Sequence, residues 1–181
     1  MNIFDEISII IPTFYPGNII NKCLETLPKS ADIIIVDNGD DEELANLIKN
    51  SDRDLRHYKI GDLGLPKSFN FALKKAKYEN ILITQPDVTF HRDSVQKLIE
   101  ASIEYKNFGI IAPHVYEDNK YSPNNSLDLR LDKKGKLIKI KNKSKIVNTI
   151  PHGDCCVDAV NATVMFLKKS VINKINGWDE N

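Results

Sequence analysis

The chain has 181 residues with 25 basic and 25 acidic side chains, and its formal net charge at pH 7 is zero. This length fits a single domain with a buried core, and the zero net charge provides no general attraction to nucleic acid. No apolar run approaches the length of a membrane span, and the acidic start at residues 1–6 is unlike a signal peptide. The three cysteines, Cys23, Cys155 and Cys156, include no CxxC pair, which indicates a reducing compartment rather than a disulfide framework or a zinc site.

The first 113 residues alternate apolar strands with amphipathic helices. Five apolar runs predict strands, all but the weaker third buried on both faces, at residues 7–11, 33–36, 55–60, 81–84 and 109–113. The helices between them are predicted to begin at Asn18, at Asp40 or Asp41, near Lys67, and at Asp93. Asp93 and Gln96 have the spacing of a capping box. This alternation predicts a mostly parallel sheet with helices on both faces.

Polar loops follow three of these strands. Pro12 is expected to end the first strand, and the loop at 12–17 lacks both the Gly-x-Gly-x-x-Gly fingerprint and a phosphate loop. Asp37 follows the second strand, and Asp87 follows the strand at 81–84. Both carboxylates are therefore expected at the edge of the sheet where ligands bind in open α/β folds. This pattern leaves two roles possible for Asp87: it binds a divalent cation, or it caps the turn before the next helix.

The pattern changes after Pro113. Residues 127–131 alternate apolar and charged side chains, and residues 137–140 are a suitable return strand, so an excursion over 114–150 is predicted to contain a solvated hairpin. The lysines between positions 133 and 145 either form a solvated face or contact an anionic lipid head group or a phosphate.

The last part of the chain returns to apolar sequence. Residues 156–167 predict one or two strands, and Ser170 is expected to cap a short helix that ends in a left-handed cap at Gly177. The histidines are interpreted as structural or surface residues, with an acceptor-side role kept open for His152.

Six pieces of this sequence, in order and spread over nearly the whole chain, resemble family 2 glycosyltransferases of the GT-A fold. They lie at residues 8–14, 34–39, 64–70, 81–88, 157–162 and 177–180. The family comprises inverting enzymes that use nucleotide sugars, and the nearest likeness is to a bacterial, rhamnosyltransferase-like branch. The resemblance implies an α/β GT-A fold with a mostly parallel sheet, helices on both faces and a small antiparallel hairpin.

The resemblance also implies a nucleotide-sugar site. Asp37 would accept a hydrogen bond from a uracil or thymine N–H, although it could instead cap its own loop. Asp87 stands at the last position of the family's Asp-x-Asp motif and would bind Mg²⁺ or Mn²⁺ and through it the diphosphate. Asn70 would lie beside the nucleotide or bond its own helix start. The implied donor-site residues are Pro12, Thr13, Phe14, Asp37, Asn38, Gly64, Lys67, Asn70, Pro86 and Asp87.

Two positions depart from the family pattern. Gln85 replaces the first carboxylate of the metal motif, and Ala162 stands where the family usually has glycine. The family's general base, an acidic pair, is expected beyond Asn181, so the resemblance implies a C-terminally truncated chain with an unknown catalytic residue. The implied acceptor-side residues are Asp158, Asn161, Trp178, Asp179 and Glu180; a turn role for Asp158 and simple packing of Trp178 are open alternatives.

Together these features predict one domain over residues 1–181. Residues 1–113 would be the nucleotide-sugar-binding half, 114–150 a variable hairpin insertion, and 151–181 the incomplete start of the acceptor-side half. The resemblance implies metal-assisted, inverting transfer from a UDP- or dTDP-linked sugar to a glycan or lipid-linked acceptor in cell-surface polysaccharide synthesis. The expected location is the cytoplasm, with peripheral contact at the inner face of the membrane left open. The alternatives are a nucleotide-binding domain that lacks the general base and, less favoured, a sugar nucleotidyltransferase.

Overall fold

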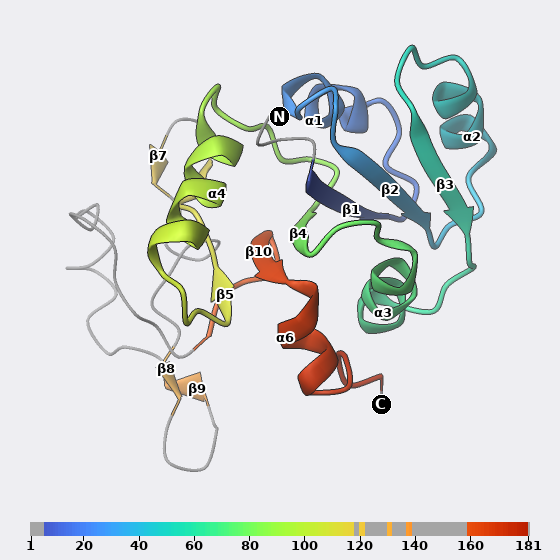
Figure 1. The fold of residues 1–181 in the computed structure, drawn as a ribbon. Coiled ribbons are helices and arrows are strands. Elements are labelled where there is room, and N and C mark those ends of the chain that lie inside the picture. The colour runs from blue at the N-terminus through green and yellow to red at the C-terminus, as the bar shows by residue number, and fades with distance from the viewer. Residues whose placement is uncertain (1–5, 118–119, 122–129, 132–136, 139–158, 181) are drawn as a thin grey trace.

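The computed structural model describes residues 6–117, 120–121, 130–131, 137–138 and 159–180. Its centre is a six-stranded sheet in the order β3-β2-β1-β4-β10-β5 (Figure 1). The four neighbouring strands β3, β2, β1 and β4 are parallel, whereas β10 is antiparallel to both β4 and β5. The strand bounds are β1 Ile7–Thr13, β2 Asp32–Asp37, β3 Leu55–Lys59, β4 Asn80–Thr84, β5 Ile110–Ile111 and β10 Val164–Lys168. The mostly parallel α/β sheet predicted from the sequence is confirmed.

Two hydrophobic cores, one on each face of this sheet, hold the helices. Successive residues of β1 point to opposite faces, so Ile9 and Ile11 lie in one core and Ile10 lies in the other. The first core receives buried side chains from α1, α2 and α4, and the second receives them from α3 and α6 (Figure 1). The helix bounds are α1 Ile19–Thr26, α2 Glu42–Lys49, α3 Leu65–Lys75, α4 Ser94–Glu104 and α6 Lys169–Lys174.

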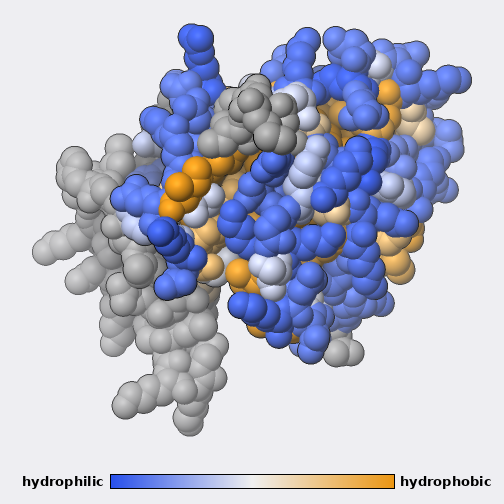
Figure 2. All heavy atoms as spheres, viewed as in Figure 1, coloured by the Kyte–Doolittle hydropathy of each residue, from blue (hydrophilic) through white to orange (hydrophobic). Residues whose placement is uncertain are grey.

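Most apolar side chains of the strands are enclosed by these two cores. Figure 2 shows hydrophobic residues only as small separate patches among hydrophilic ones on the face it presents. Within the part of the chain that the structure describes, no helix is long and apolar enough to cross a bilayer.

Two short antiparallel hairpins lie outside the central sheet. Strands β8 (Arg130–Leu131) and β9 (Leu137–Ile138) pair as the sequence predicted, with Arg130 opposite Ile138. Strands β6 (Tyr116–Glu117) and β7 (Lys120–Tyr121) form a second pair that the sequence did not predict. The lysines between 133 and 145 lie outside the described residues.

Two strand predictions were wrong. β1 does not end before Pro12 but continues to Thr13, with Pro12 paired to Val36 of β2. On its other side β1 pairs with β4 only as far as Ile10, so a residue without an N–H is tolerated at position 12. The strand predicted at 109–113 is only two residues long and lies at the sheet edge, where Ile110 is exposed rather than buried.

The helix ends show which cap residues find partners. Asp41 caps α2 as predicted, because its carboxylate accepts from the backbone N–H of Glu43 at 2.9 Å and of Leu44 at 3.2 Å. The predicted capping box at α4 was wrong, since Asp93 makes no side-chain cap bond and the Gln96 amide donates to Glu100 at 2.7 Å instead.

Near the C-terminus, α6 begins at Lys169 and Ser170 does not cap it. The Ser170 backbone N–H donates to the Glu79 carboxylate at 3.0 Å, and its hydroxyl bonds the same carboxylate. The left-handed helix end was predicted correctly: Asn176 and Gly177 have φ of +63° and +91°, and the Gly177 N–H donates to the Ile172 carbonyl at 3.0 Å.

Candidate functional site

The strand order creates a crevice at the carboxyl ends of β1 and β4. From β1 the chain proceeds outward through β2 and β3, and it then crosses back to add β4 on the other side of β1. The strand order therefore reverses between β1 and β4, and open α/β sheets bind ligands in the crevice at such a switch point.

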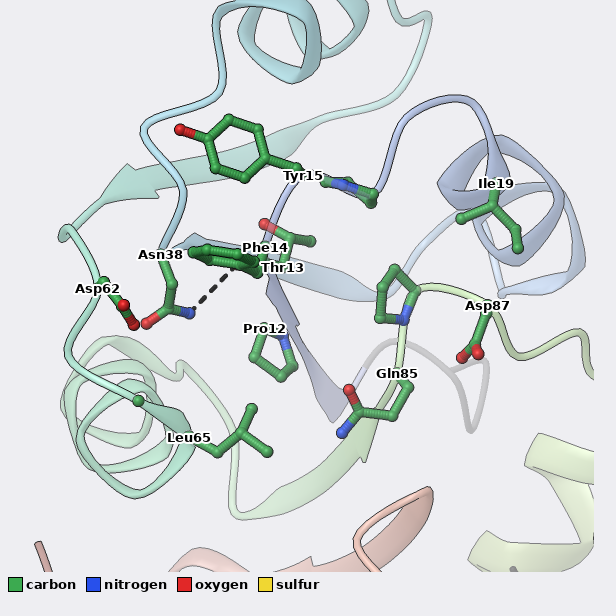
Figure 3. A pocket seen from close by; sticks show the side chains of 13 residues that line it. Pro12, Thr13, Phe14, Tyr15, Ile19, Asn38, Asp62, Leu65, Gln85 and Asp87 are labelled. Carbon is green, nitrogen blue, oxygen red and sulfur yellow. Dashed lines mark hydrogen bonds between the residues drawn. The ribbon is translucent and has the colours of Figure 1, made fainter.

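A cavity of about 590 Å³ occupies this crevice (Figure 3). It is lined by Pro12, Thr13, Phe14, Tyr15, Pro16, Ile19, Asn38, Asp62, Gly64, Leu65, Gln85, Pro86 and Asp87. Seven of these thirteen are donor-site residues predicted from the sequence: Pro12, Thr13, Phe14, Asn38, Gly64, Pro86 and Asp87. The predicted residues Asp37, Lys67 and Asn70 do not line the cavity. The sequence reasoning missed Tyr15, Pro16, Ile19, Asp62 and Leu65, and it treated Gln85 only as a departure from the family pattern.

Asn38 joins the walls of the cavity to each other. Its Nδ2 donates to the carbonyls of Thr13 at 3.3 Å and Val36 at 3.4 Å, and its Oδ1 accepts from the Ser68 hydroxyl at 2.7 Å. Its backbone N–H also donates to the Thr13 carbonyl at 2.9 Å. Asn38 is buried, so it holds β1, β2 and α3 in register around the cavity.

Asp37 lies beneath the cavity wall with no exposed surface. Its Oδ1 accepts from the backbone N–H of Gly39 and its Oδ2 from that of Asp41, both at 2.9 Å. His57 Nε2 lies 3.4 Å from Oδ2. This geometry favours the alternative in which Asp37 orders its own loop; nucleobase contact by Asp37 stays a prediction.

An aromatic pair forms one end of the cavity. The rings of Phe14 and Tyr15 meet edge to face with centroids 5.0 Å apart, and the two residues are 61% and 62% exposed. Tyr15 has a left-handed φ of +48°, and a Cβ at Gly39 would lie 2.9 Å from its ring. Glycine at position 39 therefore lets Tyr15 pack there, and Phe14 offers an aromatic surface on which a planar ring can stack.

Asp87 and Gln85 lie at the other end of the cavity. Asp87 is exposed, whereas the Gln85 amide nitrogen donates to the Ala162 carbonyl at 3.0 Å. A carbonyl only accepts, so this bond uses one hydrogen of the amide nitrogen and leaves the Gln85 Oε1 able to bind a ligand. Among the described residues there is no group of three His, Cys, Asp or Glu side chains that could hold a metal ion. A cation here would therefore rest on Asp87 and on oxygens that the ligand supplies.

Cys23 lies buried below this end, with its Sγ 3.7 Å from the Gln85 carbonyl oxygen. Burial, reinforced by the negative charge of Asp87, raises the pKa of the Cys23 thiol to about 12. The thiol therefore stays protonated at neutral pH and is unsuited to act as a nucleophile.

Asn70 holds the C-terminal segment rather than the cavity. Its amide donates to the Trp178 carbonyl at 2.9 Å and accepts from the Trp178 N–H at 2.9 Å, and it also donates to Glu180 at 2.7 Å. A Cβ at Gly177 would lie 2.5 Å from the Asn70 Oδ1, so only glycine allows this approach. Trp178 packs on Phe69 with ring centroids 5.1 Å apart, which agrees with the packing alternative.

The other acceptor-side residues are less informative. Asn161 accepts from the Thr163 hydroxyl at 3.1 Å, and Asp179 is exposed. Neither Asp179 nor Glu180 lines the cavity. Asp158 and His152 lie outside the described residues.

Asn70→Ala is expected to release Trp178 from α3. Trp178 is the sole tryptophan of the chain, so intrinsic fluorescence reports on it alone. The variant should shift the emission maximum to longer wavelength and raise acrylamide quenching, because about three hydrogen bonds of roughly 1 kcal/mol each are lost. Asn46→Ala, an exposed asparagine on α2, is the matched control and should leave emission unchanged. Identical spectra for Asn70→Ala and wild type would contradict the conclusion that Asn70 holds Trp178 in place.

The mostly parallel six-stranded sheet with its crevice has the GT-A fold. The sequence profile of Glycosyl transferase family 2 matches residues 8–161, so the chain belongs to this family. A search of curated proteins gave no match.

Solved structures show the same fold at low sequence identity. Residues 1–349 of S. aureus TarS in complex with UDP match with a TM-score of 0.65 and 15% identity over 97% of this chain and 50% of that one. TarS 1–349 with UDP-GlcNAc gives 0.63 and 16% over 94% and 47%. The mannosyltransferase PcManGT from Pyrobaculum calidifontis, in complex with GDP-Man and Mn²⁺, gives 0.61 and 14% over 97% and 48%. The chain thus spans about half the length of these structures.

Proposed function

We propose that the cavity binds a nucleoside diphosphate sugar, UDP- or dTDP-linked, with a divalent metal at Asp87. The observation that carries this proposal is the position of the cavity, at the switch point of the sheet with an exposed aromatic ring at one end and an exposed carboxylate at the other. The similar structures of TarS with UDP and UDP-GlcNAc, and of PcManGT with GDP-Man and Mn²⁺, support the same class of ligand.

Each end of the cavity suits one part of that donor. Phe14 provides a face for the nucleobase, and Pro12 and Thr13 at the end of β1 lie beside the ribose. Asp87 and the Gln85 Oε1 are hard oxygen ligands, which fit Mg²⁺ or Mn²⁺. The metal, when bound, would neutralise charge that develops on the leaving diphosphate. With a neutral amide at position 85, the protein contributes one negative charge there instead of two.

The whole enzyme is proposed to transfer the sugar with inversion to a glycan or lipid-linked acceptor in cell-surface polysaccharide synthesis. Its proposed place is the cytoplasm, at the inner face of the membrane. Inversion needs a carboxylate that takes the proton from the acceptor hydroxyl. Asp179 and Glu180 do not line the cavity, and the Glu180 carboxylate is bonded to Asn70. Donor binding is therefore the part of the reaction that we assign to this chain, and a domain that binds without catalysing is the second candidate.

Calorimetric titration with UDP and with dTDP, each with Mn²⁺ and with EDTA, tests donor binding. We expect saturable binding that is tighter with Mn²⁺. A folded sample that binds neither nucleotide under either condition would refute the proposed function. Incubation with radiolabelled UDP-sugars and water separates the two candidates, since only a catalytic chain hydrolyses the donor slowly without acceptor.

A further inference from the structure

The two helix layers that cover the sheet carry opposite charge, although the net charge of the chain is zero. Helices α3 and α6 lie on one face of the sheet, and α1, α2 and α4 lie on the other (Figure 1). The first two helices carry five lysines and no acidic residue: Lys67, Lys74, Lys75, Lys169 and Lys174. The other three carry five glutamates and three lysines: Glu25, Glu42, Glu43, Glu100 and Glu104, with Lys22, Lys49 and Lys97. One layer is therefore basic and the other is acidic.

The lysines of α3 form a stripe on the side of the helix that faces solvent. Lys67, Phe71, Lys74 and Lys75 have the spacing i, i+4, i+7 and i+8, which places them on one side of a helix. The three lysines are exposed, and Lys75 Nζ lies 5.6 Å from the centroid of the Phe71 ring. Within the described part of the chain, no carboxylate forms an ion pair with them. Their charge is therefore available to an external anion.

Helix α6 extends this basic surface and is fixed to the end of α3. Lys169 Nζ donates to the Ala76 carbonyl at 2.9 Å, and Lys174 in the last turn of α6 is exposed. Ile175, the next residue, is 65% exposed. Exposed lysines beside an exposed apolar side chain suit a membrane interface, where ammonium groups contact anionic head groups and the apolar side chain enters the acyl boundary. A nucleic acid backbone would offer nothing to Ile175.

We propose that the basic face formed by α3 and α6 docks the protein on an anionic lipid surface. Each lysine close to such a surface strengthens binding by about fivefold, and the acidic layer on the opposite face is repelled, so the molecule is oriented. Helix α3 begins at the cavity, where Gly64 and Leu65 are lining residues. Docking through α3 would therefore hold the cavity near a lipid-linked acceptor. That link to the acceptor rests on the proposed function, whereas the charge of the two helix layers does not depend on it.

Cosedimentation with lipid vesicles tests this docking. Wild type should bind vesicles of phosphatidylcholine with phosphatidylglycerol, and it should not bind vesicles of phosphatidylcholine alone. Binding should be lost at high salt, because salt screens the attraction between exposed charges. Failure to bind the anionic vesicles at low ionic strength would overturn the inference.

Neutralising three lysines identifies the surface that docks. The triple variant Lys74→Gln, Lys75→Gln and Lys174→Gln should weaken binding to anionic vesicles on the order of 100-fold. None of the three lysines lines the cavity, so the variant should bind UDP with Mn²⁺ as wild type does. A variant that keeps wild-type vesicle binding would overturn the inference.

A second triple variant is the matched control. Lys22→Gln, Lys49→Gln and Lys97→Gln remove the same charge from exposed positions on the opposite helix layer. Vesicle binding should stay within a few-fold of wild type. An equal loss in both triple variants would overturn the inference, since net charge and not this face would then control binding.

Ile175→Ser separates a lipid surface from another polyanion. It should weaken binding to anionic vesicles about tenfold, because a buried isoleucine side chain is lost from the interface. Unchanged vesicle binding by this variant, or binding of duplex DNA by wild type that is tighter than vesicle binding, would overturn the inference. A chain that binds UDP and no vesicles would overturn this inference alone, and a chain that binds vesicles and no nucleotide would overturn the proposed function alone.

Discussion

Asp87→Ala is expected to weaken UDP binding in the presence of Mn²⁺ by on the order of 100-fold, the effect typical of a damaged metal site. Asp87 is exposed at the end of β4, and Gln85 beside it is neutral, so this carboxylate is the main negative charge available to a cation there. In EDTA the variant and the wild type should bind UDP equally within a few-fold. Calorimetry under both conditions measures the difference.

Asp93→Ala is the matched control for this experiment. Asp93 is another exposed carboxylate, six residues further along the chain, which lies outside the cavity and makes no side-chain cap bond to α4. Its removal should leave the Mn²⁺-dependent affinity unchanged. An Asp87→Ala variant that keeps the Mn²⁺ effect would refute metal binding at this position. It would favour the alternative in which Asp87 only caps the turn that follows β4.

The central sheet was predictable because the relevant signal is local. Runs such as Ile33–Val36 have no polar alternation, and only a strand covered on both faces buries every residue. Pro12 and the segment at 109–113 show the limit of this signal. Whether a strand tolerates proline or becomes an edge depends on which neighbours it pairs with, and the pairing is not written in the strand itself.

Site residues at strand ends were predictable for the same reason. Thr13 ends β1, Asn38 directly follows β2, and Asp87 lies shortly after β4, so parallel pairing brings them to one edge of the sheet. The positions of Asp62 and Tyr15 could not be predicted in this way, because they depend on left-handed backbone at Tyr15 itself and at Gly61 beside Asp62. The glycines at 61 and 64 are the local signal for such backbone, but they do not indicate that the carboxylate between them lines a cavity.

Asn70 illustrates what no local pattern contains. Its partner Trp178 is 108 residues away, and the sequence offered only the nucleotide or the residue's own helix as candidates. The predicted capping box was wrong for a related reason. Asp93 and Gln96 have the right spacing, but the Gln96 amide donates to Glu100 one turn further along α4. Spacing defines which bonds are possible, and competition among partners decides which of them form.

Arg56→Met is expected to destabilise the fold by about 3 kcal/mol at pH 7, because the buried Asp32 then loses its closely bonded cation and keeps only the Lys77 ammonium 3.7 Å away. Asp32 begins β2 at the edge of the sheet opposite the cavity, with 3% of its side chain exposed. Arg56 donates to it through Nε at 2.8 Å and through a terminal nitrogen at 2.6 Å, and Ser8 donates at 2.6 Å. The melting temperature should fall by about 10 °C. Arg92→Met, at an exposed position on the loop before α4, is the control.

The pH dependence gives the sharper test of this pair. Burial acts to raise the pKa of Asp32, but hydrogen bonds from Ser8 and Arg56 outweigh it and hold the pKa below its usual 3.8. A carboxyl whose folded pKa is depressed contributes stability above its unfolded pKa, so the wild type should lose this contribution as the pH falls below about 4. Without Arg56, Ser8 and the Lys77 backbone N–H alone oppose the effect of burial, so the pKa of Asp32 should be higher in the variant than in the wild type. The variant should gain stability relative to wild type as the pH falls from 7 toward 4, which thermal melts at several pH values measure. A constant difference between the two proteins over that range would show that Arg56 acts through packing and its bond to the Lys75 carbonyl rather than through the charge of Asp32.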